Sequence, residues 1–228
     1  MPIIFSMLDE TTKAICMHVC REWRTMILDT PGKSIVPRIF AEDMVRSVSL
    51  LLWQRNILDR PFNQMTCANA AQGGHLAVLQ YLRKNGCPWD AWTCCCAAKE
   101  GHLAVLQYAH ENGCLWYEDT CSAAAEEGHL AVLQYTHENG CPWNKWTCHH
   151  AAISGHLAVL QYAHENGCPW DSYTCSNAAE GGHLAVLQYA HENGCPWDRY
   201  TFLYVRLQNK KSSHLAVLQY ARENGCPQ

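Results

Sequence analysis

The sequence carries little charge and no long apolar run, and these absences narrow the class of protein before any motif is considered. Only 17% of its 228 residues are charged, the net charge is −4, and no cluster of Lys and Arg extends beyond Lys210-Lys211. A protein that binds nucleic acid or an anionic membrane would present a denser basic patch. No apolar run approaches the ~20 residues that span a bilayer. The first ten residues also lack the basic start and long apolar core of a signal peptide. We therefore expect a cytoplasmic protein that binds neither nucleic acid nor membrane.

The sequence is rich in one repeated stretch, His-Leu-Ala-Val-Leu-Gln-Tyr, which occurs six times without change. Four successive intervals between copies are 27 residues and the last is 31. A fixed period of this length predicts a tandem array of units that bury their apolar faces against one another. The copies start at His75, His102, His129, His156, His183 and His214.

The helix-capping and turn residues of one unit predict two short helices joined by tight turns. In the second unit, Asp90 is a good helix N-cap because its carboxylate can accept hydrogen bonds from the free amides of the next turn. Gly101 and Gly113 can each take the left-handed conformation that ends a helix. Because a helix of about eleven residues is marginal alone in water, the helices must be stabilised by stacking. The fold class is therefore an all-α solenoid.

The first helix of each unit has one constant side and one varied side. Its constant positions carry small residues, which in the second unit are Thr93, Cys94, Ala97 and Ala98. On a helical wheel these fall within one arc, and the varied positions fall within the other half. We therefore expect the small residues to pack inward and the varied ones to face solvent. One varied position reads Met65, Trp92, Asp119, Trp146, Tyr173 and Tyr200 through the units, and another reads Asn69, Cys96, Ala123, His150, Asn177 and Tyr204.

A row of exposed aromatic residues at repeat spacing is typical of an interface, since such residues bury much area for few frozen torsions. We therefore predict that the varied side binds a partner protein. The alternative is drift on an unselected surface after duplication. The residues expected to contact the partner are Trp92, Lys99, Glu118, Asp119, Lys145, Trp146, His149, His150, Tyr173, Asn177, Arg199 and Tyr200.

Most of the fifteen cysteines occupy two fixed positions of the repeat, one in the first helix and one after the second. In a reducing compartment a buried free cysteine behaves as a small hydrophobe, which suits a slot between stacked units. The alternative is a metal site, since His110, Cys114 and Cys121 have suggestive spacings that return at His137, Cys141 and Cys148. No paired Cys-x2-Cys accompanies them, so neither a metal nor another cofactor is predicted. Catalysis requires one set of side chains arranged at a single site, whereas His and Cys recur here at equivalent positions of every unit. No enzymatic activity is therefore expected either.

Residues 1–28 differ from the array and read as two short amphipathic helices, with Ile15, Val19 and Trp23 on one stripe. The run from Val19 to Ile27, preceded by Ile4 to Leu8, resembles the C-terminal half of an F-box. That module docks substrate receptors onto the adaptor of a cullin-type ubiquitin ligase. The resemblance implies a docking role for Leu8, Val19 and Trp23. The Leu-Pro-x-Glu opening of an F-box is absent, so a helical cap without ligase contact is the alternative.

Residues 29–36 form a linker by their turn residues, and residues 37–63 look like a degenerate copy of the repeat that caps the array. At the other end, the last unit has four extra residues and is either a second cap or a frayed end.

The units of residues 64–228 resemble ankyrin repeats. The match lies in Ala97-Ala98, Gly101-His102 and Asn112-Gly113, although ankyrin units usually run to about 33 residues. The resemblance implies a protein-binding scaffold, expected here to be a monomer. Proteins that pair an F-box with such repeats are similar to ones encoded by large DNA viruses, which would place this one in the cytoplasm of an infected host cell.

Overall fold

The computed structural model describes residues 62–207 and 212–227. The predicted F-box-like segment, the linker and nearly all of the predicted degenerate repeat lie outside these residues. So do the predicted ligase-docking residues Leu8, Val19 and Trp23.

Across the described residues the chain forms twelve helices and no strand, arranged as six units of two helices each. The helix that comes first along the chain in each unit is here called its first helix. The first helices are α5 (Gln64–Gln72), α7 (Ala91–Lys99), α9 (Glu118–Glu126), α11 (Lys145–Ser154), α13 (Ser172–Gly181) and α15 (Arg199–Leu207). The second helices are α6 (Leu76–Lys84), α8 (Leu103–Glu111), α10 (Leu130–Glu138), α12 (Leu157–Glu165), α14 (Leu184–Glu192) and α16 (Ser212–Glu223).

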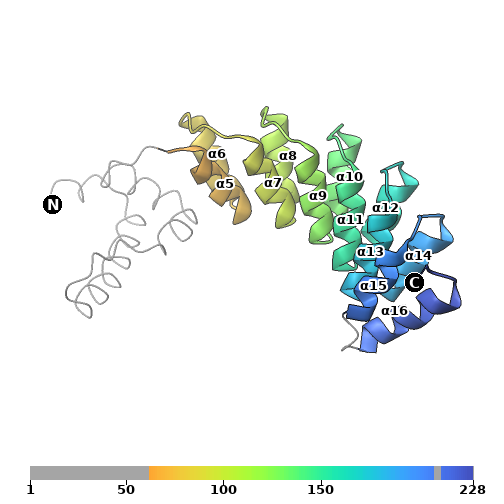
Figure 1. Cartoon of the computed structure of the whole chain (residues 1–228). Coiled ribbons are helices and arrows are strands. Elements are labelled where there is room, and N and C mark those ends of the chain that lie inside the picture. The colour runs from red at the N-terminus through yellow and green to blue at the C-terminus, as the bar shows by residue number, and fades with distance from the viewer. Residues whose placement is uncertain (1–61, 208–211, 228) are drawn as a thin grey trace, which may run out of the picture. The chain divides into compact units, whose positions relative to one another are not determined.

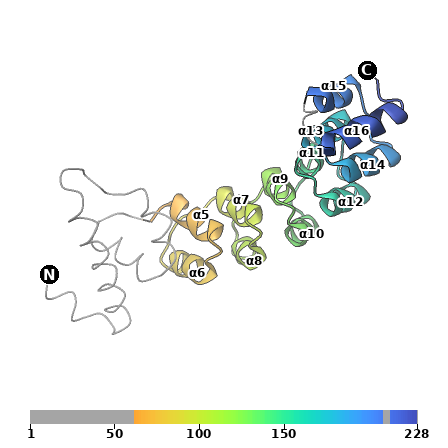
Figure 2. The same ribbon diagram turned by 90° about the horizontal axis from the view of Figure 1, so that it is seen from below.

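The units stack in chain order. Consecutive first helices pack against one another, and each packs against the second helix of its own unit. The second helices line up in a row along the array (Figures 1 and 2). This arrangement is the predicted all-α solenoid. None of the described helices combines the length and the apolar character that crossing a membrane would need.

The first helices begin where the sequence predicts. In the second unit, the Asp90 carboxylate accepts a hydrogen bond from the backbone amide of Trp92 at 3.1 Å. Asn144 caps α11 and Asp171 caps α13 in the same way. The third unit is the exception, because Tyr117 occupies the cap position and makes no side-chain cap bond. There Glu118 and Asp119 lie in the first turn, where carboxylates interact favourably with the helix dipole.

Small residues on the first helices let neighbouring units approach closely. Ala97 and Ala98 are fully buried, as are their counterparts in the units on either side. The second helices contribute larger apolar side chains to the same core, such as Val105 and Leu106. The predicted division of the first helix into a buried small-residue side and a solvent side is therefore confirmed for these positions.

The recurring Gly-His pair joins one unit to the next. Gly155 has a φ of +82°, which favours glycine. A Cβ at Gly155 would also lie 2.5 Å from Nδ1 of His183 in the following unit. The Nε2 atom of His183 donates a hydrogen bond to the carbonyl of Ile153 at 3.1 Å. The ring of the repeated histidine thus reaches the last turn of the first helix in the preceding unit.

Candidate protein-interaction surface

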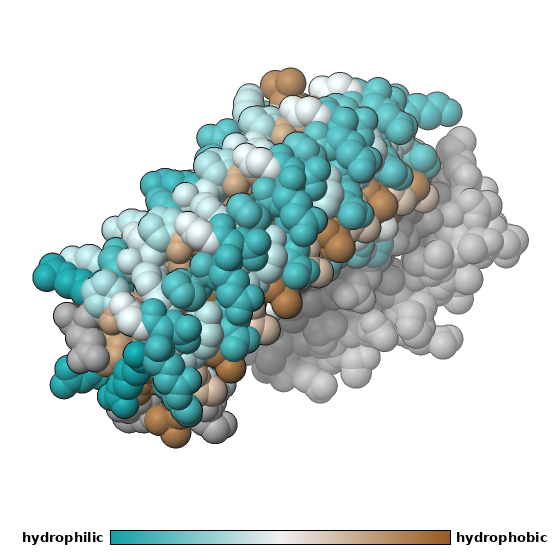
Figure 3. Space-filling view, turned by 90° about the vertical axis from the view of Figure 1, so that its right-hand side faces the viewer, coloured by the Kyte–Doolittle hydropathy of each residue, from teal (hydrophilic) through white to brown (hydrophobic). Residues whose placement is uncertain are grey.

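The solvent side of the first helices presents the predicted row of large side chains. We call this row the first-helix wall and define it by the second residue of each first helix. Their exposed fractions are 56% for Met65, 55% for Trp92, 54% for Trp146, 54% for Tyr173 and 41% for Tyr200. Asp119 interrupts the row in the third unit and is exposed too. The predicted outward orientation of these aromatic residues is confirmed. On the face seen in Figure 3, hydrophobic patches recur in rows between bands of hydrophilic side chains.

Helix capping fixes the backbone that carries each wall aromatic. The amide of Trp146 donates to Oδ1 of Asn144 at 2.9 Å, and the amide of Tyr173 donates to Oδ1 of Asp171 at 3.0 Å. Because the cap holds the residue that bears the ring, the rings are presented from fixed points at repeat spacing. Such preorganisation lowers the entropic cost of binding a partner.

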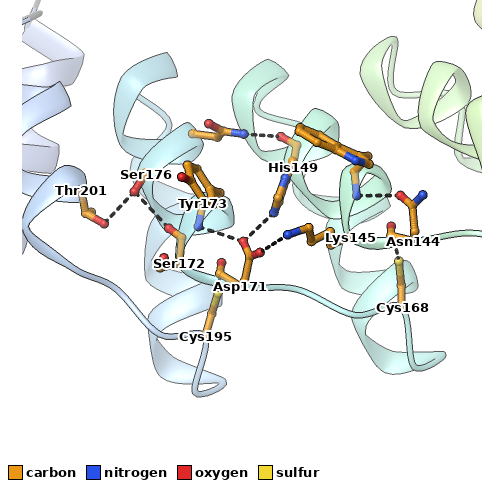
Figure 4. Close-up of polar contacts among 12 residues, drawn as sticks. Asn144, Lys145, His149, Cys168, Asp171, Ser172, Tyr173, Ser176, Cys195 and Thr201 are labelled. Atoms are coloured by element: carbon orange, nitrogen blue, oxygen red, sulfur yellow. Dashed lines mark hydrogen bonds and ion pairs between the residues drawn. The ribbon is translucent and has the colours of Figure 1, made fainter.

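A hydrogen-bonded cluster links α11 and α13 beside the wall (Figure 4). The Asp171 carboxylate accepts from Nζ of Lys145 at 2.9 Å and from Nε2 of His149 at 2.7 Å. Burial opposes ionisation of Asp171, but the hydrogen bonds from Lys145 and His149 prevail and hold its pKa below the ordinary value. Burial lowers the pKa of His149 despite the opposing effect of Asp171. The cluster therefore consists of a carboxylate, an ammonium group and a neutral imidazole at pH 7.

His149 is not available to a partner, so its predicted place on the outer surface is wrong. Its side chain is 2% exposed, and its Nδ1 atom is buried without a hydrogen-bond partner. The equivalent residues Ser122 and Ser176 are buried too. This position faces the neighbouring first helix, which a helical wheel drawn for one helix leaves out. His149 acts instead on Asp171, which in turn holds the start of α13.

The other varied position of the first helix, which Cys96 occupies in the second unit, is also less exposed to solvent than expected. Cys96 and Ala123 are buried, and His150 and Asn177 are half-buried. The amide of Asn177 donates to the carbonyl of His149 at 3.4 Å, across the junction of two units. The accessible part of the varied side is therefore concentrated on the first turn of each first helix.

The remaining predicted contact residues are charged and accessible. Glu118, Lys145 and Arg199 are exposed. Lys99 lies 3.7 Å from carboxylate oxygens of both Glu126 and Glu127. Because these pairs are largely solvated, they add little to stability. They leave the side chains free to rearrange when a partner docks.

The sequence reasoning missed a second set of rings, which lies along the second helices. The ring of His110 stacks on Trp116 with centroids 3.6 Å apart, and Tyr135 of the next unit meets Trp116 edge-on at 6.1 Å. In the first unit Arg83 takes the place of the histidine, with its guanidinium carbon 3.9 Å from the Trp89 ring centroid. We call this set the ring ladder. The same stacked pair recurs as His137 with Trp143, His164 with Trp170 and His191 with Trp197.

The ring ladder joins units and is half-buried, so it differs from the wall. Its signal in the sequence is the unvarying interval between the histidine and the tryptophan. A comparison of the varied positions alone does not reveal this interval.

The ladder also bears on the metal alternative. His110 stacks on Trp116, while the Sγ atom of Cys114 donates to the carbonyl of Asp90 at 3.1 Å. The structure therefore does not gather His110, Cys114 and Cys121 into one site. In the described part of the chain, no group of three or more His, Cys, Asp or Glu side chains is placed to hold a metal ion.

The helix pairs, the glycine turns and the stacking define a helical-repeat solenoid. A family model described as "Ankyrin repeats (many copies)" matches residues 121–164, within the third and fourth units. No curated protein matches the chain. The fold is an all-α ankyrin-like repeat solenoid, an architecture that is typically a non-enzymatic scaffold.

Proposed function

We propose that the protein is a scaffold that binds a partner protein along the first-helix wall. The observation that carries the proposal is the row of exposed aromatic side chains at one helix position, from Trp92 through Trp146 and Tyr173 to Tyr200. Large rings at fixed points are the residues that dominate binding energies at interfaces. A surface without a partner rarely keeps such residues in a regular row.

The charges beside the wall constrain the partner. Asp119 replaces the aromatic in the third unit and Glu118 precedes it, and both carboxylates are exposed. Apolar anchors therefore flank an acidic position. A complementary partner presents apolar side chains to the aromatic units and a cationic group to the third unit, because complementary charge favours the correct register.

Paired variants of the full chain test this proposal. Trp146→Ala/Tyr173→Ala removes two wall rings, and Leu115→Ala/Leu215→Ala removes two equally exposed apolar side chains that lie off the wall. Proteins captured from cell extract by the parent are first identified, and one of them is purified for direct titration. We expect the wall variant to weaken its affinity at least about tenfold, as loss of an aromatic anchor does. Equal affinity for the parent and both variants would refute the proposal.

A more specific form of the proposal makes the scaffold a substrate receptor of a cullin-type ubiquitin ligase. It rests on the F-box-like residues Val19 and Trp23 in the sequence, which lie outside the described residues. The test is recovery of the adaptor and cullin with the intact chain but not with Val19→Ala/Trp23→Ala. If neither variant nor parent recovers them, the plain scaffold that masks or gathers partners is the better description.

A further inference from the structure

Five units carry one cysteine in the first helix and another after the second helix, a feature that protein binding on the wall does not use. The Sγ atoms of Cys67 and Cys87 are 3.2 Å apart in the first unit. The next four units carry cysteines at the equivalent positions. These pairs are Cys94 with Cys114, Cys121 with Cys141, Cys148 with Cys168, and Cys175 with Cys195.

Each pair lies inside its own unit and is deeply buried. The first-helix cysteines are fully buried, and the partners that follow the second helix are nearly so. The second thiol is further positioned by the N-cap carbonyl of the same unit. Cys114 donates to the carbonyl of Asp90 at 3.1 Å, and Cys168 donates to that of Asn144 at 3.3 Å. The turn after the second helix thus holds one thiol against the first turn of the first helix.

Packing alone does not require a thiol at both positions. In the last unit, Cys226 donates to the carbonyl of Asp198 at 3.5 Å, as its counterparts do. Phe202 stands where the other units have the first-helix cysteine, and it is buried. An apolar ring therefore fills this place, and the last unit provides a natural comparison with only one thiol.

A two-coordinate soft metal fits the pair poorly. Metal–thiolate bonds of about 2.3 Å place two opposed sulfurs more than about 4 Å apart, whereas the sulfurs of Cys67 and Cys87 are 3.2 Å apart. A disulfide needs them about 2 Å apart. The pair can reach that distance by a small movement of two side chains within one unit.

We propose that these five pairs are sites of reversible disulfide formation by exchange with a small-molecule disulfide. In each unit a thiolate attacks the small disulfide, which releases one small thiol and leaves a mixed disulfide. The second cysteine then attacks the mixed disulfide, which closes the intra-unit bond and releases the second small thiol. The two protons lost by the protein end on the released thiols, and the small disulfide is the two-electron oxidant.

The folded unit controls when exchange takes place. A hydrogen bond that Cys94 donates to its partner, together with burial, raises the pKa of Cys94, and the same causes raise the pKa of Cys148 and Cys175. Protonated, buried thiols exchange slowly, so the reaction proceeds when a unit opens locally. The closed bond ties the two ends of a unit together. Trp92 is exposed whereas Cys94 is buried, so the bond leaves the wall unchanged.

The primary test maps the cysteines of the intact chain after equilibration with reduced and oxidised glutathione. Free thiols are blocked with an alkylating agent at low pH, and crosslinked peptides are identified by mass spectrometry. Among the thirteen cysteines of the described residues, we expect the five intra-unit pairs to account for the disulfides, with Cys95, Cys96 and Cys226 alkylated. The same oxidation in denaturant should give mixed pairings, because the fold selects the partners. Pairs that stay reduced, or that scramble in the native protein, would overturn the proposal.

Two exchanges between the fifth and last units sharpen this test. Phe202→Cys gives the last unit a second thiol and should create a sixth crosslink, between positions 202 and 226. Cys175→Phe reproduces the natural arrangement of the last unit and should leave Cys195 reduced, while the other four pairs still close. Circular dichroism identifies variants that retain the helical fold. A folded Phe202→Cys variant that forms no crosslink under conditions that oxidise the other pairs would contradict the geometric argument.

Discussion

Trp143 and Trp146 are three residues apart in the sequence, yet they have opposite surroundings. Trp143 belongs to the ring ladder, stacked on His137 at 3.8 Å and met edge-on by Tyr162 of the next unit at 6.3 Å. Trp146 belongs to the wall, and more than half of its side chain is exposed. The ladder position is constant among the regular units, whereas the wall position changes from unit to unit. Rings that join units cannot vary without weakening a junction, and rings that face a partner can.

The largest expected effect comes from breaking the junction between units at a glycine. Gly155→Ala should destabilise the array by about 3 kcal/mol or more, because it combines a left-handed φ with a clash against His183. Thermal or denaturant unfolding followed by circular dichroism measures the loss.

Gly140→Ala is the matched control for that change. Gly140 has a φ of +79°, but nothing lies within 4 Å of the Cβ that alanine would add. Only the conformational cost of about 1 kcal/mol remains. Equal losses for the two variants would show that the contact with His183 contributes nothing to the junction.

A smaller, pH-dependent effect is expected at the buried histidine beside the wall. Because the folded-state pKa of His149 lies below the ordinary value of 6.5, the unfolded chain binds a proton more readily there. Protonation therefore destabilises the folded state as pH falls below 6.5. His149→Ser copies the residue found at Ser122 and Ser176 and should reduce the loss of stability between pH 7 and pH 5. Identical pH profiles for parent and variant would contradict this assignment.

Asp171, the hydrogen-bond partner of His149, titrates at lower pH. Its folded-state pKa is depressed, so its stabilising contribution is present above its ordinary value of 3.8 and is lost as pH falls through the lower folded value. Asp171→Asn keeps a good N-cap residue for α13 but removes the charge. It should flatten the acid limb of the stability profile below about pH 4.

The smallest expected effect lies among the solvated charges of the first-helix side. Lys99→Gln removes the ion pairs with Glu126 and Glu127, whose side chains are well exposed. The unfolding free energy should change by no more than about 0.5 kcal/mol. A difference that persists at high salt would instead indicate a role for Lys99 in packing.

Much of the fold was predictable from local chemistry. Asp90 and Gly101 mark the ends of α7 because capping and left-handed turns depend on a few neighbouring atoms. The buried Ala97-Ala98 pair and the exposed Trp92 followed from helical periodicity. The match of residues 121–164 to ankyrin repeats agrees with the predicted resemblance.

The errors and omissions share one cause, which is that they depend on contacts between helices. His149 is buried by a neighbouring first helix, so a single-helix wheel misplaces it. The ladder needs the packing of Trp116 against Tyr135 from the next unit. The thiol pairs join positions 20 residues apart inside one unit, whereas the spacing considered for a metal site ran across two units. Sequence periodicity identifies which positions recur, but packing determines which of them meet.

The most direct test of the two-sided account compares Trp143→Ala with Trp146→Ala in two assays. Trp143→Ala should lower the unfolding free energy by about 2 kcal/mol, because it removes a stacked and half-buried ring, while affinity for the partner is retained. Trp146→Ala should change stability by no more than about 0.5 kcal/mol and weaken partner binding about tenfold. If Trp146→Ala destabilises the array as much as Trp143→Ala and leaves binding unchanged, the wall is part of the structural framework and the proposed function is wrong.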